Sequence, residues 1–279
     1  MKRIALIGFG AIARMVIDEM GKDAGNGTGT DTAQIVVEAI LVRPNRVDDA
    51  RKVLSESMPS IRVVQSVEEL LVSCPDCVVE CAGQGAVREY ADAILARGFQ
   101  LMIISTGAFA DATLLESLTN CAQRAGARLL LPSGAIAGID GLTALRVGGL
   151  DAVRYTSTKP PSAWTGTPAE TNFSLGSLTE ATIIFTGSPV EAARDYPKNA
   201  NLAMTVALAG AGVEKTEIQL VADPGATNNK GRIQAEGRFG RLDVEMEGRP
   251  APDNPKTSAS TALSIVHALR NMTATVIMA

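Results

Sequence analysis

The stretch Gly8-Phe-Gly10-Ala-Ile-Ala13 decides the fold of the N-terminal half of this chain. It follows the apolar run Arg3–Ile7 and opens the amphipathic segment Ile12–Met20, so it joins a predicted strand to a predicted helix. In that context Gly8 permits a tight turn, Gly10 lets a pyrophosphate approach the backbone, and Ala13 allows close helix-to-sheet packing. We therefore predict that this turn binds a dinucleotide, with the first helical residues, Ala11 and Ile12, facing the anion.

The pattern beyond this turn divides the chain into two domains. Apolar runs alternate with helical segments as far as residue 131, which is typical of a Rossmann-type, doubly wound parallel sheet. From Val153 onward, apolar and polar residues alternate, which favours an antiparallel or mixed sheet. The predicted class is α/β, with an N-terminal parallel sheet and a C-terminal α+β domain with a mixed sheet. We expect a dinucleotide-binding domain over 1–131, onto which a C-terminal helix (256–279) packs, and a catalytic and oligomerisation domain over 132–255.

Composition excludes several classes of protein. The 279 residues carry a net charge of -4, so there is no basic excess for binding nucleic acid or an anionic membrane. No apolar run reaches the ~18 residues of a membrane-spanning helix, and we expect a cytoplasmic protein. The single histidine, His267, rules out a multi-histidine metal site, and we expect no metal. Four cysteines, including the Cys74–Cys77 pair, are predicted to be reduced structural thiols.

The second predicted strand should supply the residue that distinguishes the two nicotinamide cofactors. It ends Ala39-Ile-Leu-Val-Arg43-Pro-Asn-Arg46, without the acidic residue that would bind the ribose 2′-hydroxyl of NAD. Arg43 and Arg46 are suited to the 2′-phosphate of NADP, although both can equally be solvated loop charges. The sequence thus favours acceptance of NADP, with NAD also tolerated.

The whole chain resembles one family, the L-aspartate dehydrogenases of the kind that serve NAD biosynthesis. Beyond the Gly-rich turn, five further segments carry this resemblance: Val79-Glu-Cys-Ala-Gly83, Pro132-Ser-Gly-Ala-Ile-Ala-Gly-Ile-Asp140, Arg154-Tyr-Thr-Ser-Thr-Lys-Pro-Pro161, Tyr196-Pro-Lys-Asn-Ala-Asn201 and Pro252-Asp-Asn-Pro-Lys-Thr-Ser258. The resemblance implies oxidation of L-aspartate by NAD or NADP to iminoaspartate. That product either hydrolyses to oxaloacetate and ammonia or is passed on toward quinolinate.

The resemblance also implies cofactor contacts outside the Gly-rich turn. Ala135 and Asn201 match family residues that contact the dinucleotide, and Ala82 and Gly83 lie in a matching segment. Asn201 is also suited to capping a helix that begins at Leu202.

The chain departs from the family at the catalytic position. The family has a histidine two residues before the Ile that matches Ile233, and Gly231 stands there. Glycine supplies no proton acceptor, and an open space is expected where the imidazole would lie. Three explanations stay open: an engineered replacement, a natural homologue in which Lys230 substitutes, or a non-catalytic relative. His267 does not match this position and is expected to be a packing or surface residue.

A dicarboxylate substrate calls for cations and hydroxyls in its pocket. The candidates are Ser133, Lys159, Asn199, Thr257 and Ser258, with Lys198 as a second cation. Thr257 and Ser258 are expected to open the last helix and offer hydroxyls and amides to a carboxylate. The alternative is that the lysines are ordinary exposed residues and that Thr257 is only a helix cap.

Two other functions compete with an aspartate dehydrogenase. One is a related reductase of the dihydrodipicolinate or homoserine type, and the other is a non-catalytic dinucleotide-binding protein. For the leading hypothesis the partners are L-aspartate or iminoaspartate, a second copy in a homodimer, and a quinolinate-forming enzyme downstream.

Overall fold

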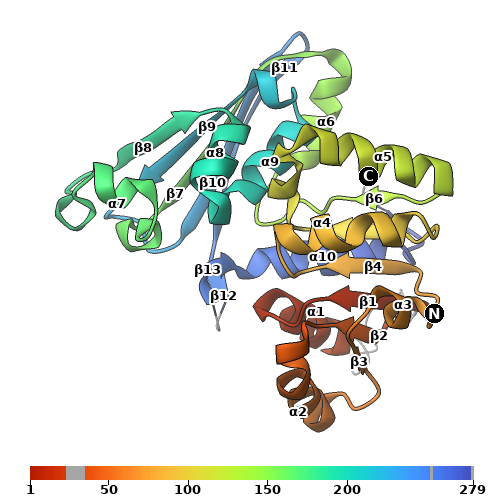
Figure 1. Cartoon of the computed structure of the whole chain (residues 1–279). Coiled ribbons are helices and arrows are strands. Elements are labelled where there is room, and N and C mark those ends of the chain that lie inside the picture. Colours follow the sequence, from red (N-terminus) through yellow and green to blue (C-terminus); the bar gives the residue numbers. More distant parts are fainter. Residues whose placement is uncertain (23–34, 252–253, 278–279) are drawn as a thin grey trace. The chain divides into compact units, whose positions relative to one another are not determined.

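The computed structural model describes residues 1–22, 35–251 and 254–277 (Figure 1). The chain forms two compact units. The first unit is Met1–Pro132 together with Ala262–Ala279, and the second is Ser133–Thr261.

The first unit is built on a six-stranded parallel sheet with the strand order β3-β2-β1-β4-β5-β6. Its strands are β1 (Lys2–Ile7), β2 (Ile35–Leu41), β3 (Arg62–Val64), β4 (Cys77–Glu80), β5 (Leu101–Ile103) and β6 (Leu129–Leu130). The strand order reverses between β1 and β4, because the chain moves outward to β3 before it returns to β4. In such sheets ligands bind outside the carboxyl ends of the strands at this switch point.

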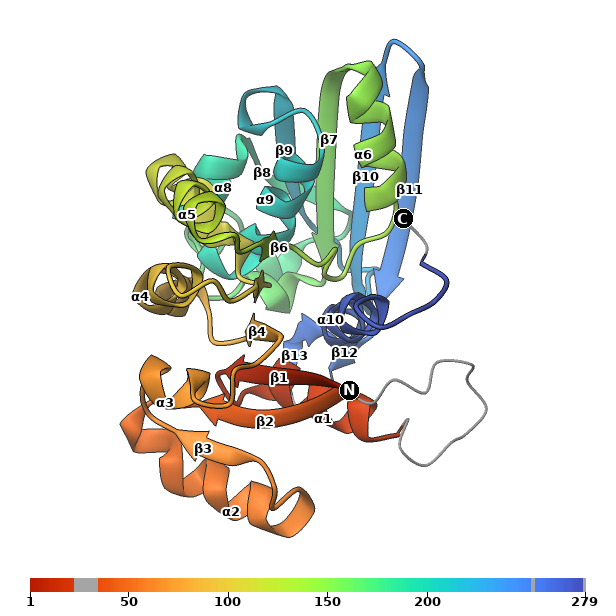
Figure 2. The same ribbon diagram turned by 90° about the vertical axis from the view of Figure 1, so that its right-hand side faces the viewer.

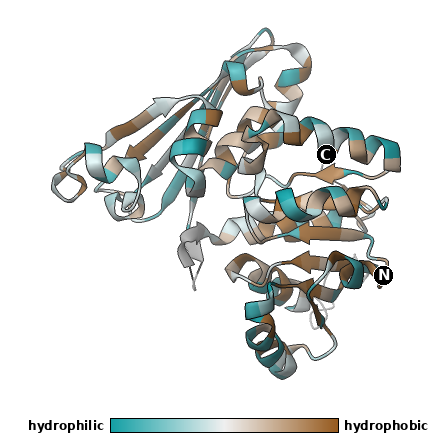
Figure 3. Cartoon of the chain, in the orientation of Figure 1, coloured by the Kyte–Doolittle hydropathy of each residue, from teal (hydrophilic) through white to brown (hydrophobic). Residues whose placement is uncertain are grey.

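Helices cover both faces of this sheet. They are α1 (Ala11–Lys22), α2 (Val47–Ser57), α3 (Val67–Leu71), α4 (Gln84–Leu95), α5 (Ala112–Ala125) and, from Ala262 onward, α10 (Ala259–Asn271), with 3-10 turns η1 (Pro44–Arg46) and η2 (Thr106–Ala110). Helices α1, α2 and α10 share one apolar core with the sheet, and Figure 2 shows α4 and α10 on either side of β4. Since both faces are covered, the strands are mostly apolar, as Figure 3 shows for β1 and β4.

The second unit contains a five-stranded mixed sheet with the order β11-β10-β7-β9-β8. Its strands are β7 (Leu150–Lys159), β8 (Thr182–Gly187), β9 (Thr216–Ala222), β10 (Asn229–Gly237) and β11 (Gly240–Gly248), and a small ribbon pairs β12 (Pro250–Ala251) with β13 (Asn254–Ser258). β7 and β9 run parallel, whereas the other neighbouring pairs are antiparallel. The predicted fold class is thereby confirmed.

One face of this second sheet is covered and the other carries charged side chains. The helices of the unit are α6 (Ile139–Gly148), α7 (Pro168–Asn172), α8 (Pro189–Asp195) and α9 (Ala200–Ala209), with 3-10 turns η3 (Pro161–Trp164), η4 (Leu175–Ser177), η5 (Pro197–Asn199) and η6 (Val213–Lys215). Side chains of α6, α8 and α9 form one core with Tyr155, Ile218 and Ile233 of the sheet. Polar residues such as Arg154 alternate with these along each strand, which is the pattern of a half-covered sheet.

Several local predictions need adjustment. The last helix spans Ala259–Asn271 within the predicted segment 256–279, because residues 256–258 belong to β13. Helix α9 begins at Ala200, so Asn201 lies in its first turn and Asn199 is the N-cap residue; the predicted capping role of Asn201 was wrong. The four cysteines are free, and burial raises the pKa of Cys77 to about 12. No helix in the described ranges is long and apolar enough to cross a membrane.

Candidate functional site

The Gly-rich turn of the first unit has the geometry that its two glycines predict. Gly8 has a φ of +92°, and a Cβ added there would lie 2.8 Å from the Cβ of Ala82. Gly10 faces open space, with nothing within 4 Å of an added Cβ. Ala13 is fully buried under the sheet. The turn therefore packs tightly at Gly8 and leaves room for a ligand at Gly10.

The start of α1 supplies the groups that an anion requires. Ala11 and Ile12 are its first two residues, and the amides of a helix's first turn have no partner within the helix. These amides and the helix dipole favour a phosphate in the space before Gly10. Close by, the Arg14 guanidinium lies 5.0 Å from the centre of the Phe9 ring, and its buried Nε has no hydrogen-bond partner among the described residues. The residues of this turn thus fit a pyrophosphate.

Arg43 and Arg46 follow β2 as the sequence indicates. Both are exposed, and no acidic side chain stands between β2 and them. Arg46 Nε lies 3.7 Å from the Asp49 carboxylate. Burial is the main cause of the raised pKa of the Tyr90 phenol in α4. The positive charge of Arg43 lies near enough to oppose this rise. Arg43 is therefore the freer of the two guanidinium groups for a 2′-phosphate.

Replacing Arg43 by alanine is expected to weaken NADP binding selectively. Loss of a charge-assisted pair with the 2′-phosphate should cost roughly 1–3 kcal/mol, whereas NAD has no such phosphate to lose. The ratio of KM for NADP to KM for NAD measures the effect. Arg51→Ala, which removes another exposed arginine of the same unit, is the control. An unchanged ratio in the Arg43 variant would refute this role.

A buried glutamate holds the segment next to the Gly-rich turn. Glu80, at the end of β4, is 1% exposed. Its Oε1 accepts hydrogen bonds from the backbone amides of Ala82 and Gly83, each at 2.7 Å. Burial raises the pKa of this carboxyl, and the hydrogen bonds that it accepts oppose the rise. The amides of Ala82 and Gly83 are thus engaged with Glu80, so a dinucleotide would meet other atoms of these residues.

Gly231 lies on the covered face of the second sheet. It is in β10 opposite Ser157 of β7, and a Cβ added there would lie 3.3 Å from the Tyr155 hydroxyl and 3.7 Å from Ile136. Tyr155 is 1% exposed; burial raises its pKa well above the usual range, and a hydrogen bond with Ser157 opposes this. The open space beside Gly231 is therefore smaller than expected, because the Tyr155 phenol occupies part of it.

Lys159 is the last residue of β7. It follows Tyr155 and Ser157 at alternate positions of β7, so all three lie on one face of the strand. Its Nζ donates to Asn199 Oδ1 and lies 5.5 Å from the centre of the Trp164 ring. Loss of water around the ammonium lowers its pKa to about 8. A cavity of about 40 Å³ opens beside it, lined by Lys159, Ala163, Thr165, Gly166, Thr167, Asn199 and Asn229.

The other predicted residues lie in varied surroundings. Lys230 alternates with Gly231 onto the opposite face of β10, where its Nζ lies 3.7 Å from Glu247. Ser258 is buried, and its Oγ lies 2.7 Å from the Ser260 hydroxyl. Ser133, Ala135 and Asn201 are half-buried residues of the second unit, and His267 is exposed on α10. The side chains of Thr257 and Lys198 lie outside the described part.

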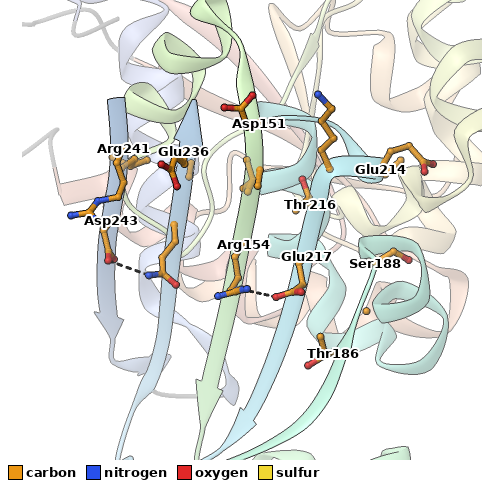
Figure 4. Close-up of a pocket in the computed structure, with 18 of the residues that line it drawn as sticks. Asp151, Arg154, Thr186, Ser188, Glu214, Thr216, Glu217, Glu236, Arg241 and Asp243 are labelled. Carbon is orange, nitrogen blue, oxygen red and sulfur yellow. Dashed lines mark hydrogen bonds and ion pairs between the residues drawn. The ribbon is translucent and has the colours of Figure 1, made fainter. Parts of the chain in front are cut away.

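Another, wider cavity of the second unit lies elsewhere. It has a volume of about 1070 Å³ and opens on the charged face of the sheet (Figure 4). Paired charges line it, such as Arg154 with Glu217 at 2.5 Å. Because strand neighbours point to opposite faces, Arg154 is directed away from the side that holds Tyr155. This cavity contains none of the predicted site residues.

Comparison with known families and proteins agrees with this geometry. Residues 8–132 match the family described as homoserine dehydrogenase, NAD binding domain, and residues 140–272 match aspartate dehydrogenase, C-terminal. The chain is 44% identical over 271 residues to the L-aspartate dehydrogenase of Cupriavidus taiwanensis and 41% identical to that of Pseudomonas aeruginosa, with 97% of each chain covered in both cases.

Solved structures extend the comparison. The aspartate dehydrogenase of Thermotoga maritima superposes with a TM-score of 0.75 at 27% identity, and the match covers all of both chains. An archaeal homoserine dehydrogenase in complex with NADPH has a TM-score of 0.55 at 13% identity, covering 95% of this chain and 96% of that one, which is a likeness of fold alone. Since identity above 40% extends along nearly the whole length of its relatives, this chain belongs to the L-aspartate dehydrogenase family.

Proposed function

We propose that this protein is a dehydrogenase that oxidises L-aspartate with NAD or NADP. The observation that carries the proposal is the 44% identity to an L-aspartate dehydrogenase over 97% of both chains. The structure supports it through the open space before Gly10 at the start of α1, which fits a dinucleotide pyrophosphate. The nicotinamide supplies the hydride acceptor when the dinucleotide is bound.

The reaction requires both a hydride and a proton to leave the substrate. The hydride departs from the α-carbon, the amino group loses one proton, and iminoaspartate forms. Water then converts iminoaspartate to oxaloacetate and ammonia, unless a quinolinate-forming enzyme consumes it first. The protein must therefore hold two carboxylates and accept a proton near the amine.

Lys159 is proposed as the cation for a substrate carboxylate. Its ammonium lies at a small cavity with Asn199, and among the described residues no carboxylate lies within ion-pair distance of it. A desolvated ammonium without an anionic partner is stabilised when a carboxylate binds. Ser133, Ser258 and Thr257 are proposed as further polar contacts of the substrate. Ala135 and Asn201 are assigned to the dinucleotide by family resemblance.

Replacing Lys159 by methionine is expected to raise KM for L-aspartate about 10- to 100-fold, because a charged hydrogen bond is lost from a site shielded from water. In the parent, KM should rise as the pH passes about 8, since the ammonium loses its proton there. Steady-state kinetics between pH 6.5 and 9.5 measure both effects. Lys215→Met, at an exposed position of the same unit, is the control. Equal KM values for the parent and the Lys159 variant would exclude this role.

The family's proton acceptor has no counterpart at the matching position of this chain. Gly231 stands at the position where the family resemblance places a histidine, and glycine has no proton acceptor. Lys230 was the sequence-based substitute, but its pairing with Glu247 on the other face of β10 gives it little support. We propose that activity toward L-aspartate is low in this chain, whether Gly231 is natural or engineered.

A spectrophotometric assay separates this function from its alternatives. Reduction of NADP and of NAD is followed with L-aspartate, with other amino acids and with homoserine, and oxidation of NADPH is followed with dihydrodipicolinate. Slow but specific oxidation of L-aspartate supports the proposal. Faster turnover of homoserine or dihydrodipicolinate would favour a related reductase, and dinucleotide binding without turnover of any of these substrates would favour a non-catalytic relative.

A homodimer and a cytoplasmic location belong to the same proposal, and sedimentation tests the former.

A further inference from the structure

The carboxylate of Glu80 collects four hydrogen bonds at the carboxyl edge of the first sheet. Besides the amides of Ala82 and Gly83, its Oε1 accepts from the Ser105 hydroxyl at 3.0 Å, and its Oε2 accepts from the Ser105 amide at 3.1 Å. Burying a carboxylate is costly, and an apolar side chain at this place would avoid the cost. Stability alone therefore does not explain why a carboxylate is buried here.

These four donors come from two neighbouring strand ends. Glu80 pairs with Ile7 of β1 on one side and with Ile103 of β5 on the other. Ala82 and Gly83 follow β4, whereas Ser105 follows β5. One carboxylate thus ties together the segments that leave β4 and β5, at the same edge where the Gly-rich turn leaves β1.

The segment held by Glu80 is the surface on which the Gly-rich turn rests. The amide of Cys81 donates to the carbonyl of Ile7 at 2.9 Å. A Cβ added to Gly8 would lie 2.8 Å from Ala82 Cβ and 3.1 Å from the Cys81 carbonyl oxygen. Residues 81–83 therefore pack directly against Gly8, and we expect a shift of this segment to move Gly8 and the backbone up to Gly10.

We propose that Glu80 is a positioning residue of the dinucleotide site, which fixes residues 81–83 and thereby the place of the Gly-rich turn. This inference rests on the proposed use of NAD or NADP. It predicts a distinctive signature, because the turn meets the pyrophosphate that both cofactors share. Loss of Glu80 should weaken the binding of NAD and of NADP by the same factor, whereas loss of Arg43 should weaken the binding of NADP alone.

Glu80→Gln tests this with little change in volume. A carboxamide offers one acceptor oxygen, so its NH2 group would face either the Ser105 amide or the donors at Oε1, and at least one hydrogen bond is lost. We expect Kd for both dinucleotides to rise about tenfold or more. The matched control is Glu68→Gln in the same unit, where an exposed carboxylate pairs with Arg97 at 2.9 Å. It should leave both Kd values within about twofold, as expected for an exposed pair.

Calorimetry with NAD and with NADP gives the readout, and thermal melting is recorded alongside. A lower Tm with unchanged Kd would show that Glu80 is only structural and would overturn the proposal. If Glu80→Gln does not fold, Ser105→Ala decides instead, since it removes one of the four donors; equal affinity in that folded variant overturns the proposal. Absence of binding by the parent would contradict the proposed function itself, a result distinct from failure of the positioning role.

Discussion

Gly10→Val is expected to abolish binding of NAD and NADP while the protein stays folded. An added Cβ at Gly10 meets no atom within 4 Å, so we expect a valine side chain to be accepted there and to fill the space before the start of α1. That space is where a pyrophosphate would approach the backbone amides. The loss therefore comes from exclusion of the ligand and not from damage to the fold.

Calorimetry and thermal melting test this expectation together. The parent should bind the dinucleotide, and the Gly10 variant should show no heat of binding at an unchanged or higher Tm, since replacing glycine reduces the freedom of the unfolded chain. Gly176→Val is a matched control, because Gly176 also faces open space but lies in the second unit. Unchanged affinity in the Gly10 variant would show that the dinucleotide binds elsewhere.

Local sequence patterns predicted the first unit well. Helix α5 (Ala112–Ala125) is one of the helical segments that alternate with the apolar runs: apolar residues recur at helical spacing between Asp111, which caps the helix, and Gly126 in a left-handed conformation. The second unit was predicted as an α+β domain with a mixed sheet, but without its strand order. Alternation of apolar and polar residues does not reveal strand direction, so the parallel pairing of β7 with β9 could not be foreseen.

The candidate site was predictable where its chemistry is local. The Gly-rich turn is one continuous segment, and its strand–turn–helix context identified it. Lys159 and Asn199 were both proposed as substrate contacts, and only the fold shows that they touch one another. Glu80 escaped prediction because its donors include Ser105, 25 residues away. The one available indication was an acidic residue at the end of an apolar strand, Cys77–Glu80.

The position of the Tyr155 side chain beside Gly231 could not be predicted from the sequence either. Its hydroxyl approaches position 231 only because β7 and β10 pair with Gly231 opposite Ser157 and Ile233 opposite Tyr155. That register places the phenol beside the position where the family resemblance expects an imidazole. A glycine in an extended strand can be replaced without backbone strain, so the space taken by Tyr155 decides what position 231 tolerates.

Gly231→His is expected to raise the turnover of L-aspartate about 10²- to 10⁴-fold, the usual contribution of a general base. An imidazole accepts a proton only when it is neutral, so the rate of the variant should rise with pH through about 6.5. A Cβ would lie 3.3 Å from the Tyr155 hydroxyl, and the phenol must shift by a few tenths of an ångström. The double variant with Tyr155→Phe removes that contact and should gain at least as much.

Three further measurements make this test decisive. Gly231→Ala adds the Cβ without a base, so it should be no faster than the parent. Free imidazole added to the parent should restore part of the rate only if a base is what the parent lacks. Lys230→Ala should leave the rate unchanged, since Lys230 pairs with Glu247 on the other face of β10. If both folded histidine variants are no faster than the parent, position 231 does not face the reacting amine. If the parent turns over L-aspartate rapidly and Lys230→Ala abolishes this activity, Lys230 accepts the proton. The absence of histidine then reflects natural divergence.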